Sequence, residues 1–574
     1  MNYTADLKKP LRQFLPEDFV LTDWNGLEPW FKDLEERKLD SREALEKWLR
    51  DMSELEAVVS EDSCWRQIRM TCDTENKQLE EAFAFFCMEI QPKIQPYADR
   101  LNRKLVECPY TQKLDQHQFF SYLRSVKKRI ELFREANIPL QAELSVLAQQ
   151  FGVISGKMTI EMNGQEYTLQ QASKFLENPD RSTREEVYRK MQEKRLQSKD
   201  TLNDLYSQLI ALRHQTALNA GFANYRDYKF EELGRFDYTK EDCFRFHDAV
   251  KEYVLPLVNK INENKKKKLG LDNLRPWDMD AEPAGTEPLH PFSHAEELIT
   301  KTTACFDQLN PFFGDCLRTM KTMGRFDLES RKGKAPGGYN CPLAETGAPF
   351  IFMNAAGQMG DLITMVHEGG HAIHSFLAHP LELSAFKEYP MEIAEVASMS
   401  MELFSMDHWD LFFTDKNDLA RARKHQLERV ITIFPWIATI DKFQHWIYEN
   451  PRHTLTERTE KWLEIMGEFS SQVIDWQGLE QYRPFGWQKQ LHLFEVPFYY
   501  IEYGIAQLGA LGLWKQYKEN KQTALSNYMS ALSLGGTRTL PELYDAARLQ
   551  FDFSKEHIKQ LMDFVSTEME KNCS

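Results

Sequence analysis

Apolar side chains recur every three to four residues over most of this chain, which is the period of an amphipathic helix. The pattern is clear over residues 27–59, 76–107 and 203–218, where charged residues separate the apolar ones. Asp40-Ser41 interrupts the first of these stretches and predicts the start of a second helix. The chain is therefore expected to be mostly α-helical.

Two stretches depart from the helical period. Residues 152–167 alternate apolar and polar side chains around Asn163-Gly164, the strongest short signal of a β-hairpin. Residues 349–354, PFIFMN, predict the clearest single strand, inside a segment from Gly324 to Gly360 that is rich in Gly, Pro and Asn. Beyond this segment the pattern is helical again. We expect a mostly α fold with a small β patch in the middle of the chain.

Charge and composition exclude several classes of protein. The 71 Lys and Arg against 87 Asp and Glu leave a net charge of −16, which argues against a nucleic-acid partner bound through its phosphates. The 42% hydrophobic and 12% aromatic content excludes a disordered chain. No apolar stretch approaches the ~18 residues of a membrane span, and the N-terminal segment shows no secretory signal. The nine scattered Cys, without a C-x-x-C pair, favour a reducing cytoplasm.

His367-Glu368-Gly369-Gly370-His371 matches H-E-x-x-H. Two His four residues apart on a helix lie on one face and can bind one metal ion, while the Glu beside that face can take a proton from water. Each Gly costs about 1 kcal/mol relative to Ala inside a helix, which indicates that another backbone comes close. Gly360-Asp361 is expected to cap the start of this helix.

A catalytic zinc site needs a third protein ligand. The longer H-E-x-x-H-x-x-G-x-x-H pattern is absent, and His374 is expected either to support a ligand or to pack in the core rather than to bind the metal itself. Downstream, Glu395 and Glu402 lie seven residues apart on one face of a helix that is rich in Ala, Ser and Met. A buried carboxylate there needs a partner, so Glu395 is the predicted ligand. Glu402 is then expected to orient a ligating His.

Several segments together resemble a known family. HEGGHAIHSF followed by IAEVASMSME is similar to the M3 family of zinc metallopeptidases, in particular its bacterial oligoendopeptidase F branch. APGGYN ahead of PFIFMN, LNAGFANYRDY at 218–228 and HLFEVPFYYIEYG at 492–504 resemble further segments of that branch. The resemblance therefore spans residues 218 to 504.

The resemblance implies one catalytic Zn²⁺ bound by His367, His371 and Glu395, with Glu368 as general base. The helical-face argument for Glu395 agrees with this ligand set. None of the nine Cys lies within the motif, so a non-catalytic protein with a structural zinc is disfavoured. A zinc carboxypeptidase of the helical H-E-x-x-H type remains the alternative enzyme.

Tyrosines of the family stabilise the oxyanion of the tetrahedral intermediate, and here the matching candidates are Tyr503 and Tyr500, with His492 as a further donor. A phenol suits this role because it donates a hydrogen bond at pH 7 without losing its proton. Spacing alone does not decide whether Tyr499 or Tyr500 pairs with Tyr503. Pro497 is expected to start the helix that carries them.

The Gly337-Gly338-Tyr339 segment is expected to contact substrate, because glycines let a peptide backbone come close. PFIFMN is interpreted as an edge strand with free N–H and C=O groups, with which an extended peptide can pair.

The resemblance further implies a large helical metallopeptidase fold with a small β-sheet beside the H-E-x-x-H helix and a deep substrate channel. We expect an N-terminal helical region over residues 1–190, which includes the hairpin, and a catalytic region over 191–574. The predicted activity is hydrolysis of internal bonds in short peptides in the cytoplasm, without a nucleic-acid or membrane partner. The sequence does not indicate the oligomeric state.

Overall fold

The computed structural model describes residues 5, 7 and 11–571, and the expected mostly helical fold is confirmed. Residues 1–4, 6 and 8–10 of the polar segment at the start of the chain, and Cys573, lie outside these residues. Of the helices within the described ranges, none combines the length and apolar character that crossing a bilayer requires.

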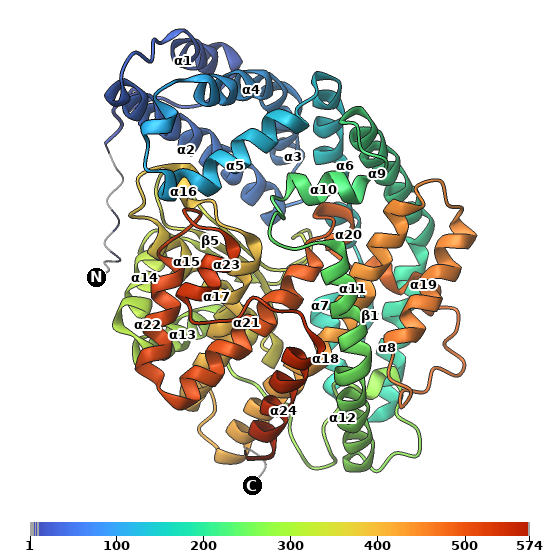
Figure 1. Cartoon of the computed structure of the whole chain (residues 1–574). Coiled ribbons are helices and arrows are strands. Elements are labelled where there is room, and N and C mark those ends of the chain that lie inside the picture. The colour runs from blue at the N-terminus through green and yellow to red at the C-terminus, as the bar shows by residue number, and fades with distance from the viewer. Residues whose placement is uncertain (1–4, 6, 8–10, 572–574) are drawn as a thin grey trace.

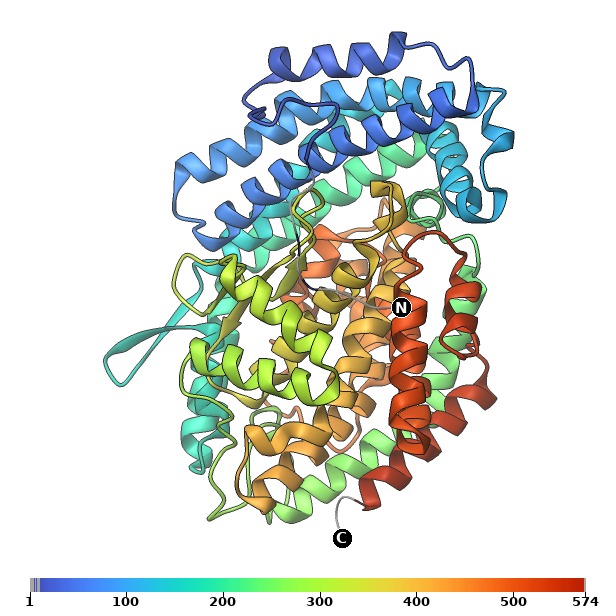
Figure 2. The same cartoon turned by 90° about the vertical axis from the view of Figure 1, so that its left-hand side faces the viewer.

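The N-terminal helices form a layer across one end of the molecule (Figures 1 and 2). Ser41 caps the second helix, at the predicted start signal, by accepting a hydrogen bond from the amide of Ala44. The layer has a hydrophobic core of its own, in which Trp48 and Leu101 are buried and which reaches Phe386 of a later helix. Its helices are α1 (Trp24–Glu36), α2 (Arg42–Cys72), α3 (Lys77–Phe85), α4 (Gln91–Glu107), α5 (Gln116–Leu132) and α6 (Ile138–Gly156).

The predicted β-hairpin forms around Asn163-Gly164 and projects from the side of the molecule (Figure 2). β1 (Thr159–Met162) pairs antiparallel with β2 (Gln165–Thr168), and both turn residues adopt positive φ. The expected start at residue 152 is wrong, because residues 152–156 are the last turn of α6. In that turn Gly152 is buried and Ile154 packs partly buried against the main core, so these residues extend the helix rather than starting a strand.

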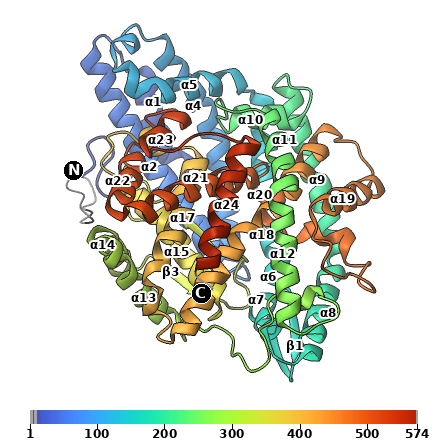
Figure 3. The same cartoon turned by 60° about the horizontal axis from the view of Figure 1, so that its bottom comes forward.

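The next group of helices lies below the N-terminal layer on two opposite sides of the molecule: those between residues 169 and 268 are on one side, and the two between residues 295 and 322 are on the other (Figures 1 and 3). Asp180 caps the first long helix of this group by accepting from the amide of Thr183. The helices are α7 (Leu169–Ala172), α8 (Arg181–Gln197), α9 (Lys199–Asn219), α10 (Tyr225–Glu232), α11 (Lys240–Ala249), α12 (Leu255–Lys268), α13 (Ala295–Leu309) and α14 (Pro311–Thr322).

A three-stranded sheet in the middle of the chain has the order β3-β5-β4. β5 (Phe350–Ala355) runs parallel to β3 (Phe326–Glu329) and antiparallel to β4 (Tyr339–Cys341). The interpretation of PFIFMN as an edge strand is therefore wrong, because β5 is the central strand. A continuous apolar run is typical of a strand covered on both faces. The edge strands are β3 and β4, and Tyr339 and Asn340 of β4 line the largest cavity described below.

The remaining helices surround the largest hydrophobic core. α15, α17 and α21 lie together at its centre (Figure 1). The helices are α15 (Met359–Ala378), α16 (Ser384–Lys387), α17 (Met391–Ser405), α18 (Lys416–Glu449), α19 (Leu455–Phe469), α20 (Leu491–Glu495), α21 (Tyr500–Glu519), α22 (Lys521–Leu532), α23 (Leu540–Ala546) and α24 (Lys555–Lys571).

Candidate metal centre and active site

The H-E-x-x-H motif lies in the middle of α15, directly after the sheet. The expected cap at Gly360-Asp361 is displaced: the helix begins at Met359 and Gln358 occupies the cap position. The Asp361 carboxylate nevertheless serves the helix start, since it accepts hydrogen bonds from the amides of Ala356 at 2.7 Å and Gln358 at 2.9 Å.

The two glycines of the motif allow close packing on either side of α15. A Cβ atom added at Gly370 would lie 2.6 Å from the Cα of Ser398 and 2.7 Å from the carbonyl oxygen of Ala397, both on α17. One added at Gly369 would meet the ring of Phe306 at 2.7 Å. The backbone of α17 is thus the close neighbour that the glycines of the motif predicted. Because Gly370 has no side chain, α17 comes close enough for one of its residues to share a ligand set with the motif.

Two imidazoles from α15 and one carboxylate from α17 converge. The Nε2 atoms of His367 and His371 lie 3.2 Å and 3.6 Å from the same Oε2 of Glu395. One ligand atom from each residue lies within 4.8 Å of the others. Two His and one Glu are a donor set of catalytic zinc sites, so these residues fit a zinc ion.

Hydrogen bonds fix the orientation of this group. Glu402 Oε1 lies 2.7 Å from Nδ1 of His367, which leaves Nε2 directed at Glu395. Gln426 in turn donates to the other oxygen of Glu402 at 2.7 Å. Partners of this kind set the tautomer and direction of a ligating imidazole.

The Glu395 carboxylate is held from two further sides. The Ser398 hydroxyl donates to Oε2 at 3.0 Å, and the Tyr499 phenol donates to Oε1 at 2.5 Å. Burial alone would raise the pKa of Glu395, but the imidazoles of His371 and His367 hold it well below its usual range. The group at this position is therefore an anion.

Glu368 is buried beside these residues. Among the described residues, its Oε2 atom has no hydrogen-bond partner. Burial raises the pKa of this carboxyl, which makes it a stronger base than an exposed Glu. An unpartnered buried carboxylate oxygen next to a metal-ligand set is available to a water molecule or to substrate.

The tyrosine segment lies across the cavity from α15. The Tyr503 hydroxyl lies 3.1 Å from Nε2 of His492, whose Nδ1 is 2.7 Å from Gln490. Burial lowers the pKa of His492 to about 4 and raises that of Tyr503 well above its usual range. Both side chains are therefore neutral near pH 7, and Tyr503 keeps its proton.

The other two tyrosines differ in position. Tyr499 lines the cavity with Tyr503 and bonds Glu395, whereas Tyr500 is not among the cavity-lining residues. The Tyr500 ring instead packs edge-on against Tyr503 and His492, with centroids 5.3 Å and 5.0 Å away. The prediction that Pro497 starts the helix is wrong, because α21 begins at Tyr500, after Phe498 adopts a positive φ of 67°.

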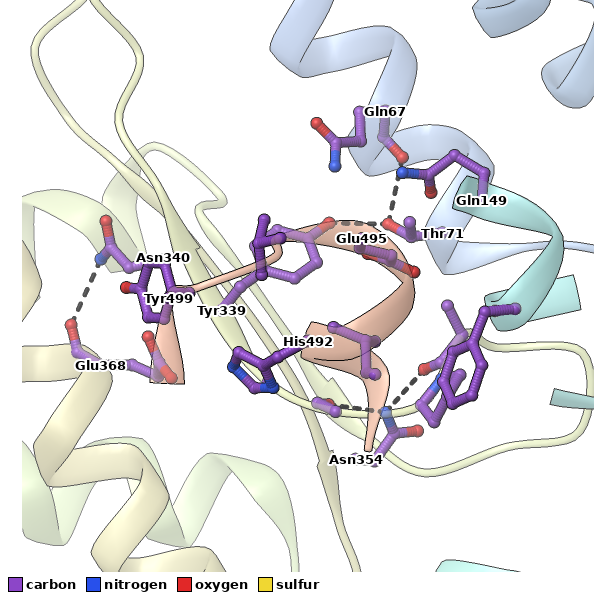
Figure 4. A pocket seen from close by; sticks show the side chains of 18 of the residues that line it. Gln67, Thr71, Gln149, Tyr339, Asn340, Asn354, Glu368, His492, Glu495 and Tyr499 are labelled. Atoms are coloured by element: carbon purple, nitrogen blue, oxygen red, sulfur yellow. Dashed lines mark hydrogen bonds between the residues drawn. The ribbon is translucent and has the colours of Figure 1, made fainter. Parts of the chain in front are cut away.

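Gly337, Gly338 and Tyr339, called the Gly-rich segment below, form the part of the cavity wall that faces Glu368 (Figure 4). A Cβ at Gly338 would lie 3.7 Å from Oε1 of Glu368, so this backbone passes directly over the Glu368 carboxylate. Gly337 has a φ of 94°, and its carbonyl accepts from Asn354 at 2.9 Å. Asn340 of β4 donates to the backbone carbonyl of Glu368 at 3.2 Å, which fastens the free strand to α15.

The N-terminal layer reaches this wall directly. The Tyr339 hydroxyl contacts Oγ1 of Thr71 on α2 at 2.6 Å, and its ring stacks on Phe352. The amide of Ala335 donates to the Thr71 carbonyl at 2.8 Å. Figure 4 shows Thr71 of α2 beside Tyr339, which follows the two glycines of this segment.

Together these elements enclose a cavity of about 1040 Å³. Its lining includes Gln67 and Gln149 of the N-terminal helices on one side and the motif and tyrosine segment on the other (Figure 4). The metal-ligand set, Glu368 and Tyr503 all face this space. The site is thus formed between two parts of the chain that are more than two hundred residues apart.

Sequence reasoning missed Lys334, which lies just before the Gly-rich segment and bonds the two strands beside it. Its buried ammonium bonds Asp327 at 2.9 Å and the carbonyl of Glu329 at 3.0 Å, and it also bonds the carbonyl of Met353. It thereby joins β3 and β5 at the point where APGGYN begins. A lysine before a Gly-Gly pair carries no signal in one sequence.

Arg235 was also missed. This buried guanidinium bonds Glu502 at 2.7 Å and the carbonyl of Phe498, which fixes the start of the tyrosine helix. Its Nε lies 4.0 Å from Glu392 on α17, whose other contact is a 2.6 Å hydrogen bond from Tyr238. Glu392 therefore joins α17 to the buried network around Arg235.

His374 lies away from the metal-ligand set, as the packing interpretation predicts. It is buried, and its ring stacks on Tyr389 with centroids 3.5 Å apart. Burial lowers the pKa of His374 well below its usual range, so the ring is neutral.

Comparison with known proteins decides the family. The profile of peptidase family M3 matches residues 174–563, and that of the peptidase M3 N-terminal domain matches residues 14–133. The chain belongs to peptidase family M3. The expected family is thereby confirmed, and the protein is a peptidase.

Curated proteins are similar to this chain over different lengths. An oligoendopeptidase F homolog of Borreliella burgdorferi is 24% identical over 542 residues, covering 88% of this chain and 87% of that protein. Oligopeptidase PepF of Bacillus subtilis is 24% identical over 332 residues, covering 54% of this chain and 48% of that protein.

Solved structures give the same answer. A structure of Pz peptidase A with an inhibitor has a TM-score of 0.92 at 26% identity, covering 96% of this chain and 99% of that one. An X-ray structure described under the name oligoendopeptidase F has a TM-score of 0.92 at 26% identity, covering 99% of both chains. The expected fold class and the oligoendopeptidase F branch of this M3 peptidase are confirmed. The division of the chain at residue 190 stays a prediction.

Proposed function

We propose that this M3 peptidase is a zinc-dependent endopeptidase that hydrolyses internal bonds of short oligopeptides in the cytoplasm. The observation that carries the proposal is the convergence of His367, His371 and Glu395 next to the unpartnered Oε2 of buried Glu368. The relatives named oligoendopeptidase and oligopeptidase support the substrate class.

His367, His371 and Glu395 would hold the metal ion. Two imidazoles and a carboxylate suit Zn²⁺, and three protein ligands are the number found in catalytic rather than structural zinc sites. When bound, zinc supplies Lewis-acid polarisation of the peptide carbonyl and lowers the pKa of water to about 7.

Glu368 acts as the proton carrier. Its free Oε2 accepts the proton of the attacking water and then delivers it to the leaving amine, so one carboxylate serves as base and acid in turn. The raised pKa of Glu368 brings it closer to the pH at which both transfers are efficient.

Tyr503 stabilises the oxyanion of the tetrahedral intermediate. Its phenol keeps its proton, faces the cavity and is positioned by His492 at 3.1 Å. The position of Tyr500 outside the cavity lining assigns it to packing against these two rings rather than to direct contact with substrate. Tyr499 serves the metal ligand Glu395 instead.

The free edge of β4 is the proposed binding strand for the peptide backbone. Tyr339–Cys341 pairs with β5 on one side only, and the adjoining Gly337 and Gly338 leave room above Glu368. An extended peptide added to this edge would place a backbone carbonyl beside the metal-ligand set.

A Glu368→Gln variant tests the reaction. We expect it to bind zinc as the wild type does and to lose ~100-fold or more in kcat, because the amide does not accept the proton. Glu388→Gln is the matched control, since Glu388 lines the same cavity but lies on the surface in an ion pair with Arg129. Full hydrolysis by the zinc-bound Glu368→Gln variant would contradict the proposal.

Substrate comparison separates the endopeptidase from the alternative carboxypeptidase. An internally quenched peptide with an amidated C-terminus is expected to be cut as readily as its free-acid form, because an endopeptidase does not read the terminal carboxylate. Cleavage of the free acid alone would establish the carboxypeptidase instead. Product masses from a mixed peptide library would then give the length limits.

A further inference from the structure

A second cluster of potential metal ligands lies between α11 and α18, outside the cavity. Cys243 and His247 are four residues apart on α11, and Asp441 and His445 are four residues apart on α18. Residues with this spacing share one helical face. The two helices therefore present a Cys-His pair to an Asp-His pair.

The cluster is compact and completely buried. One ligand atom each of Cys243, Asp441 and His445 lies within 4.8 Å of the others. The exposed fraction is 2% for Cys243, 0% for Asp441 and 2% for His445. His247 lies beside them, with Nε2 2.8 Å from Oδ2 of Asp441.

Hydrogen bonding within the protein does not satisfy this group. Among the described residues, Oδ1 of Asp441 and both ring nitrogens of His445 have no hydrogen-bond partner. The nearest approach of His445, 3.3 Å from Nε2 to Oδ2 of Asp441, lacks hydrogen-bond geometry. Since buried polar atoms are almost always paired, three unpaired atoms on two residues of one buried cluster require an explanation.

The charge of Asp441 also indicates that this cluster needs a cation. Within the described part of the chain, no Lys or Arg forms an ion pair with the buried Asp441, whose ionic partners are the two imidazoles. A buried carboxylate needs a cation nearby.

We propose that Cys243, Asp441 and His445 bind a second Zn²⁺ ion, separate from the catalytic one, and that the adjacent Nε2 of His247 supplies the fourth ligand that a site without water requires. Thiolate and imidazole together favour zinc among the common divalent ions. One thiolate and one carboxylate neutralise its charge, which a site without solvent requires. The thiol proton is released to solvent as the ion binds, as in other zinc–thiolate sites.

This ion would stabilise the segment that positions the active-site tyrosines. The ring of His445 packs against that of Phe498 at 5.4 Å, and the neighbouring Gln444 accepts a hydrogen bond from the Phe498 amide at 2.6 Å. Phe498 adopts the positive φ that directs the chain into Tyr499 and α21. The second site therefore has a structural role, and its ligands do not touch substrate.

Metal content of the full-length protein tests the proposal. Protein saturated with zinc and then desalted is expected to hold about two ions per chain, and the isosteric Cys243→Ser and Asp441→Asn variants about one. Cys316→Ser is the matched control, because Cys316 is also buried but lies on α14 outside both clusters, and this variant should hold about two. A single ion per chain in the saturated wild type would overturn the proposal.

Cobalt substitution gives a readout that does not depend on a variant folding. The catalytic ligands contain no sulfur, so thiolate-to-cobalt charge-transfer absorption reports on the second site alone. We expect this band in the wild type and in His367→Ala, which loses peptidase activity, and expect its loss in Cys243→Ser. Absence of the band from cobalt-saturated wild type would refute the second site while leaving the proposed peptidase function intact.

Discussion

Gly370 sets the distance between the two helices that carry the proposed metal ligands, and replacing it with Ala tests that role. The new methyl group would lie 2.6 Å from the Cα of Ser398 and 2.7 Å from the carbonyl of Ala397. Both are backbone atoms of α17, so no side-chain rotation relieves the contact. The helices must separate.

The size of the effect follows from these distances. Ordinary contact begins near 3.4 Å, so α17 must move by about 0.8 Å. Metal ligands need to stay within ~0.2 Å of their preferred distances, and Glu395 moves with α17. We expect Gly370→Ala to lose ~10–100-fold in zinc affinity at the catalytic site and about 1–3 kcal/mol in the free energy of unfolding.

Peptidase activity in zinc buffers of fixed free concentration measures the catalytic affinity, and urea unfolding measures stability. Gly360→Ala is the control, because Gly360 lies in the same helix and a Cβ there meets nothing within 4 Å. That variant is expected to gain up to about 1 kcal/mol in stability from helix propensity and to keep its zinc affinity. If Gly370→Ala matched Gly360→Ala in both measurements, the packing argument would be refuted.

Three further predictions concern the other side of the cavity. Tyr503→Phe should lower kcat by ~100-fold or more with little change in KM, because it removes one oxyanion donor while the ring still packs. Arg235→Met should lower the free energy of unfolding in urea by about 3–5 kcal/mol, since it leaves Glu502 buried without its cation. For Glu495, burial raises the pKa from 4.5 to about 8, so the folded state binds the proton more tightly than the unfolded state. That stabilisation is complete below pH 4.5 and is lost as the pH rises through about 8, so the Tm of the wild type should fall relative to Glu495→Gln across this range.

Each of these predictions has an outcome that would contradict it. Tyr503→Phe with a raised KM and an unchanged kcat would place Tyr503 in substrate binding only. Adding Glu502→Gln to Arg235→Met should restore part of the lost stability, and a purely additive loss would exclude the buried pair as the cause. A constant difference in Tm between wild type and Glu495→Gln at every pH would exclude a raised pKa for Glu495.

Local patterns in the sequence determined the elements of this protein and the chemistry of its motif. The helical period, Ser41 and Asn163-Gly164 depend only on neighbours in the chain, so they predicted the helices, a cap and a hairpin turn. The spacing of four residues between His367 and His371 likewise predicted two ligands on one face of a helix. The sequence also predicted Glu395 as a ligand, because a buried acid on an apolar helix needs a partner.

Where sequence reasoning was wrong, the deciding contact lay far away in the chain. PFIFMN is a central strand because β3 and β4 cover its two sides, which no property of the six residues specifies. Tyr499 and Tyr500 are adjacent and chemically identical. Only the path of Phe498, which is fixed by Arg235 and Gln444, directs one toward Glu395 and the other away from the cavity.

Tertiary structure alone decided which residues support the site and where the substrate space lies. Lys334 and Arg235 act by bonding carbonyl groups and carboxylates that folding brings to them, so their sequence context carries no sign of the role. The cavity exists because helices of the N-terminal layer pack over a metal-ligand set that lies about three hundred residues later. Spacing along a helix is local and can be read from the sequence, whereas the packing of distant segments requires the fold.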